Sequence, residues 1–310
     1  MAIPNSYVTS GLSEYIAENQ EVIIKDIVLG NGMKGATIPE LNIQTGVKTS
    51  ERIHFMDTNV VLQDGEGCGF NANGGTEFTE RDITTGQFKV NDQYCPEDLL
   101  SKFNEGKVKI NANGGEMPYE AQITEAIVNG INKQMESLIW TGSVDGGDLI
   151  DGFLTQSENS DSASTIFVES ESGASAYERV LATYMAIPEQ IVDEAVIFVS
   201  PALFRSYVQD LVSANLYHYD PSFSGELTEM FIPGASVKVR KTYGLAGQDD
   251  IYCSTFSNMF GACDLENAKE EVKLWFSDDD DVYKLKVRWN FGVAVLYPDM
   301  VIVNKIASGL

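Results

Sequence analysis

The longest regular run of apolar positions predicts a helix that begins near Pro118 and ends before Gly142. Proline at the first turn loses no helical hydrogen bond, and Glu116 and Glu120 place negative charge at the positive end of the helix dipole. The apolar residues recur every three to four positions, which is the spacing of one helix face. They are Ile123, Ile127, Ile131, Met135 and Leu138. We expect this face to lie in the core.

A different pattern, strict alternation, predicts a long β-strand over residues 283–295. Because successive side chains of a strand point to opposite faces, the strand has an apolar face and a basic face. The apolar face consists of Tyr283, Leu285, Val287, Trp289, Phe291, Val293 and Val295. The basic face carries Lys284, Lys286, Arg288 and Asn290. Alternation over residues 272–276 predicts a neighbouring strand across an acidic turn, and a last short strand is expected over residues 300–306.

Residues 52–62 and 78–90 have strand patterns on either side of a glycine-rich turn at residues 64–75. The glycines of this turn are Gly65, Gly67, Gly69, Gly74 and Gly75. A two-stranded hairpin is marginally stable by itself in water. We therefore expect this excursion to lie on another surface.

The region after residue 172 alternates helix and strand signals. Ser175 is a good N-cap with Glu178 at capping-box spacing, and Pro188 ends the helix that follows. A buried strand at residues 195–199 leads into a second helix that opens with Pro201. This alternation predicts a compact α/β unit.

The first 29 residues predict one short helix with weak internal packing. Gly30, Gly32 and Gly35 follow it and interrupt any regular structure. We expect this segment to be an arm that is loosely attached to the rest of the chain.

Composition is that of a globular protein, with 43% apolar and 22% charged residues. The net charge of -25 argues against tight binding to DNA or to anionic lipid, because both would be repelled. No apolar run approaches the roughly 20 residues that cross a bilayer, and we expect no secretory leader. The four cysteines form no C-x-x-C pair, which indicates reduced thiols in a cytosolic protein.

No motif supports catalysis, a cofactor or a metal. Ser143 stands one place early for a G-x-S-x-G nucleophile elbow, and the spaced glycines of the 64–75 turn lack the following helix of a dinucleotide site. Residues 278–281 indicate a solvated acidic turn rather than a cation site. His54 and His218 have no carboxylate or cysteine partner visible in the sequence, so we expect structural roles for both.

Three stretches carry a resemblance to a known family. They are Leu138-Ile139-Trp140-Thr141-Gly142 with the Gly/Asp loop that leads to Gly152-Phe153-Leu154, then Val196-Ile197-Phe198-Val199-Ser200-Pro201 with its helix, and Val287-Arg288-Trp289-Asn290-Phe291-Gly292-Val293 up to Pro298. In this order, and after the arm and the excursion, they make the chain similar to the major capsid proteins of tailed phages, which have the Hong Kong 97-like fold. The resemblance extends over nearly the whole chain.

The resemblance implies an α+β fold with an N-terminal arm, an extended hairpin (the E-loop), a peripheral domain with a long spine helix, and an axial α/β domain. The implied bounds are 1–48 for the arm and lead-in, 49–92 for the E-loop, 93–172 for the peripheral domain, 173–269 for the axial domain, 270–298 for the peripheral strands and 299–310 for a C-terminal axial segment.

The resemblance also implies a structural role, as the subunit of an icosahedral phage head built from pentamers and hexamers in the host bacterial cytoplasm. A separate scaffold protein is expected, because the N-terminus has no charged heptad segment, and a portal and a cement protein are further candidate partners. Packaged DNA would be enclosed without tight specific binding. No lysine occurs from residue 49 to 88, so the lysine–asparagine crosslink of some family members is not expected.

The candidate contacts between subunits are the basic row and the glycines of the turn. They are Lys284, Lys286, Arg288, Gly65, Gly67, Gly69, Gly74 and Gly75. An encapsulin-type nanocompartment shell is the main alternative, and the long glycine-rich excursion and the lack of a cargo-site signature favour the phage. A soluble cytosolic enzyme and a β-rich adhesin or glycan-binding module remain alternatives from other classes.

Overall fold

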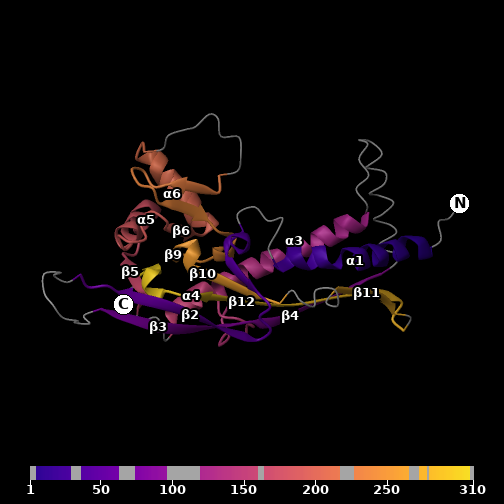
Figure 1. The fold of residues 1–310 in the computed structure, drawn as a ribbon. Helices are drawn as coiled ribbons and strands as arrows, with labels where there is room; N and C mark the ends of the chain where they lie inside the picture. Colours follow the sequence, from indigo (N-terminus) through magenta and orange to yellow (C-terminus); the bar gives the residue numbers. More distant parts are fainter. Residues whose placement is uncertain are drawn as a thin grey trace.

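The computed structural model describes residues 5–28, 36–62, 74–95, 119–159, 164–216, 227–264, 272–277 and 279–307. Gly65, Gly67, Gly69, His218 and Asp278 lie outside these residues. The described part contains two mixed sheets, a separate two-stranded hairpin and two long helices that run side by side (Figure 1).

Helix α3 (Tyr119–Thr141) is the helix predicted from the apolar spacing. Its buried side chains include Ile131 and Met135, and the most deeply buried are Ile139 and Trp140 at its end. Gly142 follows the helix because a Cβ at this position would lie 2.5 Å from the carbonyl oxygen of Leu138. Only glycine allows the chain to turn so closely over the last helical residues.

The N-terminal segment corrects the expectation of a short, weakly packed helix. Helix α1 (Asn5–Val28) has 24 residues and packs against α3. Its buried residues are Ile16, Ile23, Ile24, Ile27 and Val28. They are spaced along one helix face, and Gln20 donates a hydrogen bond to the carbonyl oxygen of Val272. The N-terminal segment therefore contributes to the main core of the chain.

The first sheet is organised around the long strand β12 (Val282–Val295), which has the predicted alternation of buried and accessible positions. Strands β11 (Val272–Ser277) and β10 (Met259–Cys263) pair with successive parts of one edge, and β4 (Gly86–Tyr94) pairs along the other edge. Strand β1 (Asn42–Thr45) extends the sheet beyond β10. The apolar face of β12 packs against the helices, and Trp289 stacks on Phe88 of β4.

The second sheet has the order β5-β13-β9-β6-β8-β7. The strands are β5 (Ile166–Ser170), β6 (Val196–Val199), β7 (Glu229–Phe231), β8 (Lys238–Lys241), β9 (Ile251–Ser254) and β13 (Ile302–Ile306). Helices α5 (Ala176–Met185) and α6 (Pro201–Ser213) pack on this sheet, and short helix α4 (Phe153–Glu158) contacts α3. The capping box is confirmed, because the Ser175 hydroxyl accepts from the Glu178 N–H and the Glu178 carboxylate accepts from the Ser175 N–H.

Two strands lie in a different sheet from the one that the bounds implied by the resemblance would give them. Strand β5 lies in the second sheet although it precedes residue 173, and β10 lies in the first sheet although it precedes residue 270. Strand order depends on pairing between distant segments, and the local pattern of a short apolar strand does not reveal its partner.

The excursion is a hairpin of β2 (Ser50–Asn59) and β3 (Gly75–Thr84), paired along its full length. The single strand expected over residues 78–90 is two strands, because the chain changes partner from β2 to β12 at Thr85. We call this change of partner at Thr85 the crossing. Gly292 of β12 lies against it, and only glycine fits there, since a Cβ would lie 2.0 Å from the carbonyl oxygen of Thr84. In Figure 1 the hairpin projects away from the N-terminal end of α1.

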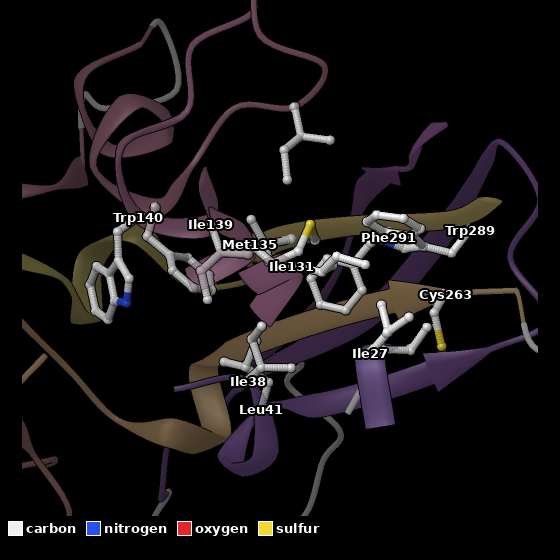
Figure 2. Close-up of a cluster of buried hydrophobic side chains, with 14 of the residues drawn as sticks. Ile27, Ile38, Leu41, Ile131, Met135, Ile139, Trp140, Cys263, Trp289 and Phe291 are labelled. Atoms are coloured by element: carbon white, nitrogen blue, oxygen red, sulfur yellow. The ribbon is translucent and has the colours of Figure 1, made fainter. Parts of the chain in front are cut away.

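The main core lies between the helices and the first sheet. Figure 2 shows Ile27 of α1, Met135 of α3 and Phe291 of β12 converging in it. At the second sheet the core continues as an aromatic cluster, in which the Trp140 ring lies 5.0 Å from Phe198 and 5.2 Å from Tyr252. The 3-10 turns are η1 (Ile38–Glu40), η3 (Tyr243–Leu245), η4 (Phe256–Asn258) and η5 (Pro298–Met300).

Candidate functional site

The open face of the first sheet gathers basic side chains from three strands. Lys284, Lys286 and Arg288 lie on the face of β12 opposite the helices, as the alternation predicted. In register, Lys273 of β11 lies directly opposite Lys286. Lys89 of β4 lies directly opposite Arg288. We call these five residues the basic face, and the described strand residues on it include no carboxylate.

The charges of the basic face repel one another. The pKa of Lys286 is lowered, first by burial and then by Arg288, Lys89 and Lys273. Lys284 has a partner, because it donates to Asp280 and lowers the pKa of that carboxyl group. Within the described part of the chain, Lys89, Lys273, Lys286 and Arg288 form no ion pair. A hollow beside them is lined also by Asn91, Asp92, Gln93 and Trp275.

Lys89 and Lys273 were not among the predicted contact residues. Each lies on a short strand, and the pattern of that strand does not indicate which strand pairs with it. The signal that could have found them is their position on strands that alternate in phase with β12, but the register of pairing is needed to place them.

The second candidate surface is a row of exposed apolar side chains on the hairpin. Met56 and Phe78 are directly opposed in the register, and Phe78 is 77% exposed. Val60 and Leu62 continue the row beyond the end of β2, and Leu62 is 94% exposed. Large apolar side chains exposed together indicate a surface that is covered in the functional state. We call these four residues the apolar row.

Of the predicted turn glycines, Gly74 and Gly75 lie in the described part of the chain. Gly75 begins β3 opposite Asn59, and a Cβ there would contact nothing within 4 Å. Gly74 is more constrained, because its Cβ would lie 2.8 Å from the carbonyl oxygen of Asn59. Neither residue contacts the basic face of its own chain.

A charged cluster lies near the base of the hairpin. Arg52 donates to Glu80 and Asp82 at 2.8 Å, which raises the pKa of the guanidinium and lowers that of Asp82. The Nδ1 atom of His54 lies 3.3 Å from the Glu80 carboxylate, and the His54 side chain is exposed. Glu80 lies opposite His54 on the neighbouring strand, and no local sequence pattern indicates this contact.

A buried carboxylate, not anticipated from the sequence, joins three parts of the fold. Both oxygens of Glu136 accept from the Thr37 N–H, at 2.9 and 3.0 Å. The indole N–H of Trp140 donates to the Thr37 hydroxyl at 3.0 Å. Arg240 of β8 donates to the carbonyl oxygen of Ala36 and pairs with Glu40 at 2.6 Å. Burial raises the pKa of Glu136, and the hydrogen bonds from Thr37 oppose that shift.

Of the three free cysteines among the described residues, Cys253 and Cys263 are buried and Cys95 is exposed. Burial raises the pKa of Cys253 and raises that of Cys263 to about 11, so neither thiol ionises near neutral pH. Among the described residues, no three metal-ligating side chains are grouped to hold an ion, and no helix is long and apolar enough to cross a membrane.

The comparisons with known proteins identify the fold. No protein-family model matches the sequence, and no curated protein matches it. The capsid of an empty GTA particle matches with a TM-score of 0.58 at 12% identity, over 89% of this chain and 91% of that chain. The chain has the Hong Kong 97-like capsid fold. The α+β class expected from the sequence is thereby confirmed.

Two further solved structures show the same likeness. The procapsid of satellite phage P4, which includes the size determination (Sid) protein, has a TM-score of 0.55 at 12% identity, over 98% of this chain and 92% of that chain. A virus-like particle from Pyrococcus furiosus has a TM-score of 0.50 at 10% identity, over 93% of this chain and 98% of that chain. At these identities the likeness concerns the fold.

Proposed function

We propose that the chain is the major capsid subunit of a tailed double-stranded DNA phage, a structural protein rather than an enzyme. The observation that carries the proposal is the apolar row on a projecting hairpin, in a chain with a capsid fold. A monomeric protein rarely exposes such a row, whereas a shell subunit buries it against a neighbour. The basic face and the turn glycines are the other proposed contacts between subunits.

In this proposal the subunits form pentamers and hexamers that close into an icosahedral virion shell, assembled in the host bacterial cytoplasm. A separate scaffold protein, a portal and a cement protein are proposed partners, and the packaged DNA is enclosed without tight specific binding. The net charge of -25 supports this last point, because it disfavours a strong grip on a polyanion.

Electron microscopy of the purified chain tests the proposal. We expect closed shells, or pentamers and hexamers that close when the scaffold is supplied. Monodisperse particles near 34.0 kDa would contradict the proposal and favour the soluble enzyme. A nanocompartment shell is the second candidate, supported by the likeness to the virus-like particle, and shells that contain a protein cargo instead of DNA would favour it.

The shell is further proposed to lack covalent links between chains. A lysine delivered by the hairpin is required for an isopeptide bond of the family's kind, and the nearest lysines are Lys48 and Lys89 at its base. Denaturing electrophoresis of mature particles should give a single band near 34.0 kDa. A ladder of boiling-resistant multimers would contradict this.

A further inference from the structure

The basic face concentrates cations in an otherwise acidic chain. It gathers five of the 21 lysines and arginines on three adjacent strands. Lys286 opposes Lys273, and Arg288 opposes Lys89, and directly opposed like charges destabilise a sheet. Of the five residues, only Lys284 has a carboxylate partner within the described part of the chain. The face therefore favours an anion from outside the chain.

The same face also offers groups for the uncharged parts of a ligand. Trp275 of β11 lies directly opposite Lys284, and its ring is 43% exposed. On the other side of β12, Gln93 lies opposite Lys284 and Asn91 lies opposite Lys286. Cations that bind phosphates, a ring on which a base stacks and amides that reach base edges are the groups with which proteins bind single-stranded nucleic acid.

A hollow brings these groups together. Its volume is about 480 Å³, and its lining includes Trp275, Asn91, Gln93 and Asp92. Asp92 is the one carboxylate of this lining, and it already accepts from the Tyr94 hydroxyl at 2.6 Å and from the Gln93 N–H at 2.9 Å. Helices α1 and α3 pack on the opposite side of the sheet (Figure 1). Pockets of about 300–1,000 Å³ hold small ligands, so the hollow has room for a nucleotide unit.

The dimensions and the exposed ring favour a single strand over a duplex. From Lys284 to Arg288 the face extends over four residues, about 14 Å, and across three strands it is about 10 Å wide. In a duplex the faces of the bases are stacked inside the helix, where Trp275 could reach them only after a base is flipped out. A single strand presents its phosphates and its base faces together.

We propose that the basic face of the unassembled subunit binds single-stranded nucleic acid, with phosphates on its cations and a base stacked on Trp275. The net charge of -25 limits the affinity without preventing contact, because charges farther away than about 8–10 Å are largely screened at physiological salt. The binding is therefore weak and independent of sequence, with a Kd of about 1–100 µM. It goes beyond the proposed function, and it uses a surface that assembly would cover.

Fluorescence anisotropy of a labelled 12-nucleotide oligothymidylate, titrated with the full-length unassembled chain, tests the role of the charges. K286E/R288E should weaken binding at least about tenfold, and raising salt from about 50 to 200 mM should weaken wild-type binding by a similar factor. The matched control is K133E/R205E, which makes the same change in net charge at two exposed cations of α3 and α6. It should bind within about twofold of the wild type. Circular dichroism shows whether each variant folds.

Trp275 gives a second readout that does not depend on charge. The other two tryptophans of the chain, Trp140 and Trp289, are buried. Quenching of intrinsic fluorescence by unlabelled oligothymidylate should therefore come from Trp275. Trp275→Leu should abolish the quenching and weaken binding at least about fivefold, whereas Trp275→Phe, which keeps a ring, should bind within about threefold of the wild type.

Two other anions identify the occupant. Inorganic triphosphate has phosphates without a base, and a 12-residue polyglutamate has the carboxylates of an acidic protein surface. Each should bind at least about tenfold more weakly than the oligothymidylate and leave Trp275 fluorescence unchanged. Equally tight binding of either would assign the face to free phosphates or to an acidic protein and overturn the inference.

Equal affinity of the wild type and K286E/R288E for the oligothymidylate, or unchanged quenching in Trp275→Leu, would also overturn the inference. All these measurements use unassembled subunits. A chain that binds the oligothymidylate as expected but forms no shells would therefore contradict the proposed function and leave the assignment of the basic face intact.

Discussion

Strands β3 and β4 are consecutive in the chain, yet they differ in what stabilises them. In β3 nearly every side chain is exposed, and Ile83 near its end is the one that is buried. In β4, which lies beside β12 in the first sheet, Phe88, Val90 and Tyr94 are half-buried against the main core, and Phe88 stacks on Trp289. Both strands have long partners, so pairing alone does not distinguish them.

The difference lies in the layer beneath each strand. The first sheet has α1 and α3 on one face, so its strands bury apolar area within the subunit. The hairpin has no such layer among the described residues, and a two-stranded hairpin is marginal alone. Under the proposed function, a second subunit supplies the missing layer and covers the exposed apolar row. The predictions below test the two regions in order of expected effect.

The largest effect is expected in the body of the chain, by which we mean the two sheets with their helices. Trp140→Ala removes a fully buried ring that contacts Phe153, Phe198 and Tyr252, together with the hydrogen bond to Thr37. The free energy of unfolding of the unassembled subunit should fall by about 3–5 kcal/mol. Chemical denaturation measures it. A loss below about 1 kcal/mol would show that this aromatic cluster does not support the body.

The second largest effect is expected at the crossing between β3 and β4. Gly292→Ala places a Cβ against the Thr84 carbonyl, and we expect a loss of about 1–3 kcal/mol. The control is Gly130→Ala on α3, where a Cβ meets nothing within 4 Å, and it should stabilise by about 0.5–1 kcal/mol. Equal effects from the two substitutions would contradict a tight crossing at Thr84.

The buried carboxylate gives the body a pH dependence. Since the pKa of Glu136 is raised above its ordinary value of 4.5, its folded form binds a proton more readily than its unfolded form. Its contribution to stability is fully present below pH 4.5 and declines as pH rises through the raised pKa. Glu136→Gln cannot titrate and should lack this decline. Denaturation midpoints of the wild type and of Glu136→Gln, measured from pH 4 to 8, test this prediction. Midpoints that change with pH in the same way in the two chains would contradict a raised pKa of Glu136.

The sequence predicted the elements that depend on local pattern. The spacing of Ile131 and Met135 gave α3, the alternation through Trp289 gave β12, and Ser175 gave the cap of α5. What it missed depends on distant pairing. The opposition of Lys273 and Lys286, and the change of partner at Thr85, require a register that no local pattern contains.

Two further misses have different physical causes. The helix pattern predicts an exposed polar side chain at Glu136. Its burial follows from the fold, which brings the Thr37 N–H to its carboxylate. The sequence predicts a loose arm at helix α1 because its apolar residues are sparse before Ile16 and glycines follow it. Its burial depends on the face that α3 and β11 present to it.

The smallest effect on the isolated chain is expected from the hairpin. Phe78→Ala should change the free energy of unfolding of the unassembled subunit by less than about 0.5 kcal/mol, because the ring is 77% exposed. The same substitution should lower shell yield, since the proposed assembly covers the ring with a neighbouring subunit. A large loss of monomer stability with normal assembly would reverse the roles of the two regions.

Hydrogen exchange before and after assembly tests the central claim most directly. The amides of residues 50–59 and 75–84 should exchange rapidly in unassembled subunits and become strongly protected in shells. The amides of residues 127–141 on α3 should be protected in both states, because the core that covers them lies within one subunit. Hairpin amides that exchange at the same rate in subunits and in closed shells would contradict the claim that assembly covers the hairpin.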